Sequence, residues 1–152
     1  MKLSTKTRYG LRALIDLTIH YGEGGVLLKD IADRQEVSLK YLSHIISALN
    51  TSGIVTNVRR RRGGYVLSRV PSEITAYEVF RALEGSLELV ECVDDPKVCD
   101  WANFCALRRL CGKLNDSMTS VLQGVTLADL AQEEQGRTGQ TIQDNKGKNI
   151  PG

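Results

Sequence analysis

The segment from residue 29 to residue 68 constrains the fold most strongly, because two short helices are followed at once by a basic β-hairpin. KDIADRQ makes about two helical turns, and Ser38 is well placed as the N-cap of the helix SLKYLSHIISALNTSG. Apolar residues in that helix recur at i, i+3, i+4 and i+7, which predicts one buried face. They are Leu42, Ile45, Ile46 and Leu49. The pair is therefore predicted to be a helix-turn-helix.

The opposite face of the second helix is polar and carries no carboxylate. Such a face suits a helix that enters the DNA major groove, because donors and acceptors must approach the bases without charge repulsion. A solvated surface face is the alternative interpretation. The candidate DNA-binding residues of this helix are Ser38, Lys40, Tyr41, Ser43 and His44.

The sequence IVTNVRRRRGGYVLS predicts a hairpin with an arginine-rich tip, formed by Arg59, Arg60, Arg61 and Arg62. The two glycines that follow permit the positive φ values of a turn. Adjacent guanidinium groups repel one another unless an anion neutralises them, so they suit phosphate contact or a narrow minor groove. A lone basic run is usually surface. Directly after a helix-turn-helix, however, it is typical of the wing of a winged helix.

Two further helices complete the predicted DNA-binding domain, residues 1–85. The first runs from Ser4 to Tyr21, and the second, TAYEVFRALEG at 75–85, begins with a capping box formed by Thr75 and Glu78. We expect the second to close the core. The stretch 86–103 has no sustained period and is predicted to be a long loop, which inside a compact protein is often functional.

A heptad pattern predicts a long dimerisation helix over 104–125. Its seam residues follow spacings of three and four. They are Phe104, Leu107, Cys111, Leu114, Met118, Val121 and Val125. An amphipathic helix packed on its own domain is the alternative. TLADLAQEE predicts a short packing helix, which ends this region at 134, and the polar remainder, 135–152, is expected to be a disordered tail. The predicted fold is mainly α with a small β-hairpin wing: a winged helix-turn-helix domain plus a long dimerisation helix.

All four cysteines fall between residues 92 and 111. The N-terminus has no apolar run of signal-peptide or membrane-spanning length, so we expect a cytoplasmic protein without membrane attachment. In a reducing cytosol, clustered cysteines suit metal binding or redox sensing better than structural disulfides. Cys111 lies on the apolar seam and is expected in the core. Cys92, Cys99 and Cys105 can converge at a helix N-terminus, and their wide spacing fits an iron–sulfur cluster better than a zinc hook.

The charge distribution divides the chain. Residues 1–69 carry 12 Lys/Arg and 5 Asp/Glu, a net +7, whereas residues 70–152 carry 8 and 13, a net −5. The basic half indicates a polyanionic partner. Only two histidines are present, neither in a nucleophile motif, so the sequence does not favour an enzyme.

Together these motifs resemble the winged-helix iron–sulfur cluster regulators of the IscR and NsrR type, over about residues 1 to 134. The resemblance rests on MKLSTKTRYGLRAL, DIADRQEVSLKYLSHII, VRRRRGGYVL and the three-cysteine loop. It implies a dimeric bacterial transcription factor that binds a double-stranded DNA operator through the helix beginning at Ser38 and the wing. It also implies a [2Fe–2S] cluster, or in some members a [4Fe–4S] cluster, held by Cys92, Cys99 and Cys105.

The chain departs from both types at the fourth ligand. The IscR type has a histidine where this chain has Arg108, and the NsrR type has an aspartate where it has Arg8. The candidates that stay open are Cys111, an acidic residue such as Asp100, a histidine of the partner subunit (His20 or His44), or a small molecule. The wing departs too, since two arginines replace the frequent Pro-Gly.

We therefore expect a homodimeric DNA-binding regulator, not an enzyme, whose operator binding is modulated by an iron–sulfur cluster and reports iron, redox or nitrosative status. A regulator of the same fold that uses its cysteines for zinc or for a thiol redox switch is the alternative. An iron–sulfur electron carrier is the least favoured, because it has no use for the arginine wing.

Overall fold

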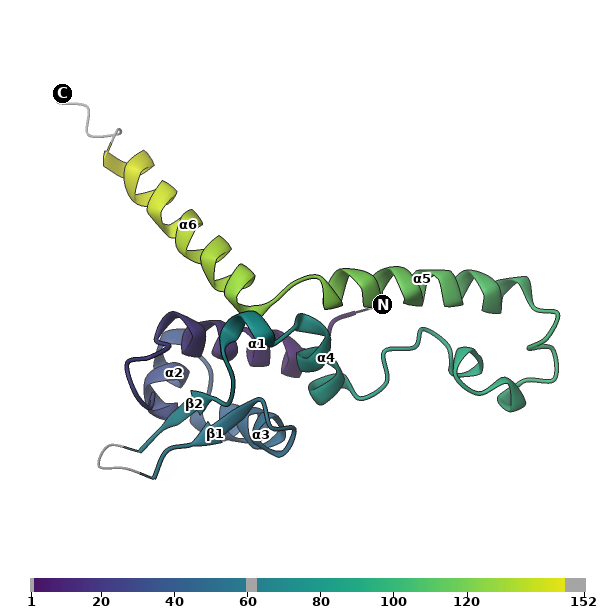
Figure 1. Cartoon of the computed structure of the whole chain (residues 1–152), viewed down its shortest axis with the longest axis horizontal. Coiled ribbons are helices and arrows are strands. Elements are labelled where there is room, and N and C mark those ends of the chain that lie inside the picture. Colours follow the sequence, from purple (N-terminus) through teal and green to yellow (C-terminus); the bar gives the residue numbers. More distant parts are fainter. Residues whose placement is uncertain (1, 60–62, 147–152) are drawn as a thin grey trace.

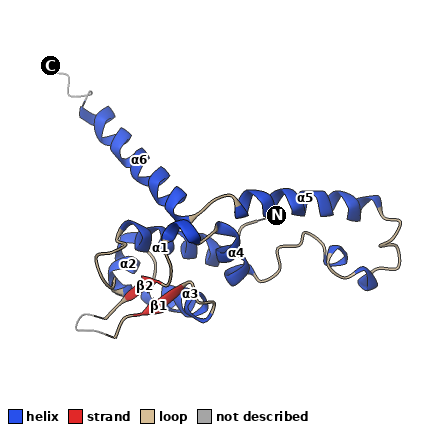
Figure 2. Cartoon of the chain, viewed as in Figure 1, coloured by secondary structure: helices blue, strands red, loops and turns tan. Residues whose placement is uncertain are grey.

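The computed structural model of the chain describes residues 2–59 and 63–146. This part contains six α-helices and one antiparallel two-stranded hairpin, so the predicted fold class is confirmed (Figures 1 and 2). The helices are α1 (Thr5–Ile19), α2 (Leu28–Gln35), α3 (Leu39–Thr51), α4 (Ala76–Glu84), α5 (Ala106–Gln123) and α6 (Leu127–Lys146), and the strands are β1 (Val55–Asn57) and β2 (Tyr65–Leu67). Helix α5 extends away from the winged body (Figure 1). Within the described residues, no helix is both long enough and apolar enough to span a membrane.

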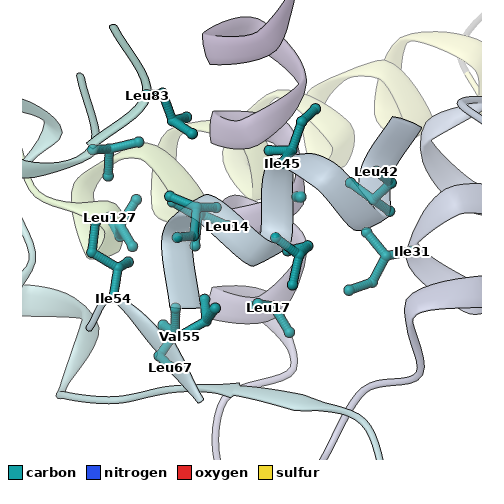
Figure 3. Packing of buried hydrophobic residues seen from close by; sticks show 14 of the residues in the cluster. Leu14, Leu17, Ile31, Leu42, Ile45, Ile54, Val55, Leu67, Leu83 and Leu127 are labelled. Atoms are coloured by element: carbon teal, nitrogen blue, oxygen red, sulfur yellow. The ribbon is translucent and has the colours of Figure 1, made fainter. Parts of the chain in front are cut away.

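The hydrophobic core lies between α1, α3 and the hairpin (Figure 3). Leu14 of α1 and Ile45 of α3 are completely buried, and Val55 and Leu67, which are paired across the hairpin, cover one side of the core. The apolar face predicted for the second helix of the helix-turn-helix is entirely buried. Its burial fixes which side of α3 faces outward, because i and i+4 residues share a face.

An ion pair joins the first helix of the helix-turn-helix to α1. Arg34 donates from Nε to Asp16 Oδ2 at 2.8 Å and from its terminal nitrogen to Asp16 Oδ1 at 2.6 Å. This hydrogen bond to the buried carboxylate raises the pKa of Arg34. An arginine–carboxylate pair with two hydrogen bonds fixes the relative orientation of the two side chains as well as their distance. It therefore stabilises the packing of α2 on α1.

A second polar contact ties the start of α1 to the end of α4. Glu84 accepts hydrogen bonds from the Ser4 hydroxyl and from Thr7 Oγ1, the latter at 2.6 Å, and these bonds lower its pKa. The predicted capping box at the start of α4 is present: the Glu78 amide donates to Thr75 Oγ1, and the Thr75 amide donates to Glu78 Oε2.

The prediction that the winged core is complete by residue 85 is wrong. Leu127, at the start of α6, is fully buried in this core (Figure 3). Backbone hydrogen bonds join the two segments: the Ala76 amide donates to the Val125 carbonyl at 2.8 Å, and the Leu127 amide donates to the Ile74 carbonyl at 2.9 Å. The chain leaves the domain through the loop and α5, and then returns to finish its core.

The disordered tail expected over 135–152 is wrong for residues 135–146, which continue α6. Residues 147–152 lie outside the described part of the chain. The first turn of α6 is held by Leu127 and by reciprocal hydrogen bonds between Thr126 and Asp129. Once such a nucleus exists, each added residue gains a backbone hydrogen bond, so the helix propagates through a segment without an apolar pattern.

Candidate DNA-binding surface and cysteine loop

The recognition surface begins at the N-terminus of α3. Ser38 is the N-cap, and its hydroxyl accepts a hydrogen bond from the Tyr41 amide at 3.1 Å. Lys40, Ser43 and His44 are exposed. Helix α3 contains no acidic residue, so its outward side offers donors and acceptors without repelling a phosphate backbone. The structure thus places three of the candidate DNA-binding residues together on the exposed side of α3, whereas Tyr41 is half-buried against Tyr9.

The wing is anchored at its base. Val26 and Tyr65 exchange two backbone hydrogen bonds, at 3.0 and 2.8 Å. Gly64 has a φ of 100°, and a Cβ at this position would lie 2.6 Å from the Val26 carbonyl oxygen, so only glycine fits. Arg59 is exposed on the wing. Arg60, Arg61 and Arg62, the other predicted wing residues, lie outside the described part of the chain.

A basic cluster on α1, which was not among the residues predicted to bind DNA, adjoins α3. The guanidinium carbons of Arg8 and Arg12 lie 5.9 and 5.3 Å from the Tyr9 ring centre, within cation–π range. The Tyr9 ring in turn contacts Tyr41 edge-on, at 6.1 Å between centroids. The sequence contains a signal that could have revealed this cluster: two arginines four residues apart, and so on one face of a helix, with a tyrosine between them. This cluster adds positive charge beside α3.

The cysteine loop, residues 86–105, contains two short 3₁₀ turns, Glu91–Val93 and Pro96–Val98. Cys92 is half-buried and Cys99 is exposed, and Cys105 is the half-buried N-cap residue of α5. All are free thiols. Cys111 is buried on α5, in agreement with its expected place in the core.

The donor set is chemically suited to an iron–sulfur cluster, because cysteine thiolates are its usual ligands. The arrangement is different from the one we expected. Within the described residues, no three His, Cys, Asp or Glu side chains are close enough together to hold one metal ion. The predicted convergence of Cys92, Cys99 and Cys105 is therefore not observed in this conformation.

The predicted heptad seam lies on one side of α5, and only one edge of it is buried. Cys111 is buried against the chain itself, and Met118 is half-buried. An apolar stripe along the neighbouring edge is exposed, and it includes a leucine outside the predicted seam. Its members are Leu107 (60% exposed), Leu110 (54%), Leu114 (45%) and Val121 (66%). Phe104 precedes the helix, which begins at Ala106, and is 83% exposed. Isolated exposed apolar residues are ordinary, but a contiguous stripe marks an interaction surface.

A helix-turn-helix with an exposed polar recognition helix, a glycine-anchored wing and an adjoining basic cluster defines a winged-helix DNA-binding protein. Residues 3–133 match the Rrf2 family, described as "Iron-dependent Transcriptional regulator". The match spans most of the sequence, and the chain belongs to the Rrf2 family of transcriptional regulators. The predicted resemblance to winged-helix regulators of this family is confirmed, and so is the prediction that the protein is a regulator and not an enzyme.

Relatives of known structure support both fold and class. The chain is 40% identical over 136 residues to the HTH-type transcriptional regulator CymR of Bacillus subtilis (strain 168), covering 90% of this chain and 94% of that protein. The structure of CymR, titled the global cysteine regulator of B. subtilis, matches with a TM-score of 0.73 over 88% of this chain and 98% of that one. IscR of T. potens matches with the same TM-score and 38% identity, over 88% of each chain.

Proposed function

We propose that this protein is a homodimeric transcriptional regulator that acts in the cytoplasm and binds a double-stranded DNA operator through α3 and the wing. The observation that carries the proposal is the carboxylate-free outward face of α3, together with the exposed Arg59 of the wing and the basic cluster of α1. Positive charge provides affinity for phosphates, and the polar side chains of α3 provide base recognition.

The exposed stripe of α5 supports a homodimer. Leu107, Leu114 and Val121 are spaced by seven residues, the repeat with which helices pair along a common seam. Because α5 extends away from the winged body (Figure 1), pairing two α5 helices leaves both recognition helices free. Two reading heads then fit a two-fold symmetric operator.

DNA binding is tested by titrating labelled DNA with protein between 50 and 200 mM salt. A dimer that neutralises about six to eight phosphates should lose a factor of about 10³ or more in affinity over this range. A genomic-fragment selection supplies the specific sequence, and random DNA of equal length is the control. Equal affinity for selected and random DNA at every salt concentration would remove the case for an operator.

For the signal, we propose an iron–sulfur cluster, with [2Fe–2S] as the expected form, bound by Cys92, Cys99 and Cys105. Three thiols on one loop, the family description as iron-dependent and the likeness to IscR support this. A bound cluster would supply sensitivity to iron supply or oxidants. The loop residues would supply the ligands, and they must move closer together to do so.

A second candidate is a regulator of the same fold in which the cysteines bind zinc or act as a thiol redox switch. Two observations favour the thiol switch: Cys99 is exposed, and no three donors converge among the described residues. The likeness to the regulator titled as the global cysteine regulator also supports a thiol-based signal.

The candidates are separated by measuring iron, acid-labile sulfide and zinc, with the visible spectrum, in protein purified without oxygen. Four single Cys→Ala variants assign the ligands. Loss of iron and sulfide in the variants at Cys92, Cys99 and Cys105, with retention in the Cys111 variant, supports the cluster. Stoichiometric zinc without sulfide, or neither metal, supports the second candidate. Loss in all four variants makes Cys111 a ligand as well.

A further inference from the structure

The cysteine loop is connected to α5 by one arginine. Arg108 donates from Nε to the carbonyl oxygen of Cys92 at 2.5 Å, across 16 positions of sequence. The backbone hydrogen bonds within the described part of the loop are local, such as those from the Val93 amide to the Val90 carbonyl and from the Ala102 amide to the Cys99 carbonyl. Within the described loop, Arg108 therefore makes the long-range hydrogen bond that folds residue 92 back onto the helix.

The charge pattern agrees with this contact. The segment 91–100 carries four carboxylates and one lysine, a net charge of −3. The first turn of α5 has no acidic residue and contains Arg108 and Arg109. Basic residues are disfavoured at a helix N-terminus by the helix dipole. An acidic loop folded against that turn offsets this cost.

The same contact connects two cysteines of the loop to one arginine. Cys105 and Arg108 are three residues apart at the start of α5, so they lie on the same face of the helix. Cys92 is held to Arg108 through its backbone. The arginine thus links the first and third cysteines of the loop without contributing a metal ligand, since a guanidinium has no lone pair to donate.

We propose that Arg108 is a positioning residue of the cysteine loop. Its hydrogen bond clamps the backbone of Cys92 to the first turn of α5 and so holds this end of the loop against the helix. The signal then acts on a loop in which Cys92 is already held at the start of α5. This inference rests on the proposed sensing role of the loop. The clamp itself needs only residues of this chain.

The test is site-resolved pulse labelling of the four thiols with iodoacetamide in reduced, metal-free protein, followed by mass spectrometry. Arg108→Met keeps the length and the apolar stem of the side chain but removes the donor. Loss of one hydrogen bond from a charged donor should increase loop opening, and with it the labelling rate of Cys92, about tenfold. Cys111 serves as the internal reference and should keep its rate.

Matched variants decide the interpretation. Arg109→Met removes an equal charge from the neighbouring position, whose exposed side chain has no part in this hydrogen bond, and should label like the parent protein. Arg108→Lys restores a positive donor and should recover most of the protection. An unchanged Cys92 rate in Arg108→Met, or an equal rise at Cys92 and Cys111, overturns the clamp. Because no metal is present, failure of the cluster proposal leaves this result unaffected.

Discussion

Leu114→Glu is the sharpest test of the exposed stripe on α5. Leu114 lies midway between Leu107 and Val121, and it is 45% exposed in the single chain. Full burial of a leucine is worth about 1.5–3 kcal/mol, so burying the exposed half in a dimer contributes about 1 kcal/mol per subunit. Two lost leucines therefore weaken the dimer by about 2 kcal/mol, or about 30-fold in the dissociation constant. Two glutamates facing each other add a further penalty, because a buried carboxylate without a partner is costly.

The assay is sedimentation velocity over a hundredfold range of protein concentration, together with DNA binding at the same concentrations. Gln123→Glu is the control, since residue 123 lies on the opposite side of α5 at 3.6 residues per turn. We expect the Leu114 variant to sediment as a monomer with weakened operator binding, and the control to match the parent protein. If the Leu114 variant remains a dimer throughout, the stripe is not the dimer interface and its exposure has another cause.

Further predictions concern the DNA-binding surface and the core. Arg59→Ala should reduce the slope of log affinity against log salt concentration by about two in a dimer, on all DNA sequences alike. His44→Ala should instead weaken binding only to operators with particular base pairs. Titrations on selected and on random DNA distinguish the two effects. Glu84→Gln should lower the urea midpoint at pH 7. Hydrogen bonds from Ser4 and Thr7 hold the pKa of Glu84 below its ordinary value of 4.5. The difference in urea midpoint between the parent protein and the Glu84 variant should therefore shrink as pH falls through 4.5 and below. An equal difference in midpoint at pH 3 and pH 7 contradicts this role of Glu84. Leu127→Ala should cost about 2–5 kcal/mol in denaturant unfolding, and a cost below 1 kcal/mol would show that α6 is dispensable for the core.

The local pattern of the sequence was enough to predict the elements of the winged helix. The N-cap Ser38 and the capping box of Thr75 and Glu78 act within a few residues of their own position, and the positive φ of the wing glycines is a local property of the turn. The buried face of α3 follows from helical spacing alone. These features are determined by sequence because their physical causes, namely local hydrogen bonds, steric freedom and periodicity, are local.

Tertiary structure decided the features that depend on distant residues. Leu127 completes the core only because the chain returns after α5, and periodicity cannot show which element an apolar residue will meet. The heptad seam was visible in the sequence, but only packing shows that Cys111 faces inward while Leu110 faces solvent. The contact from Arg108 to Cys92 spans 16 residues, and no spacing rule predicts it. The burial of Leu127, the orientation of α5 and the contact from Arg108 to Cys92 all depend on packing between segments far apart in sequence, because only the folded chain brings those surfaces together.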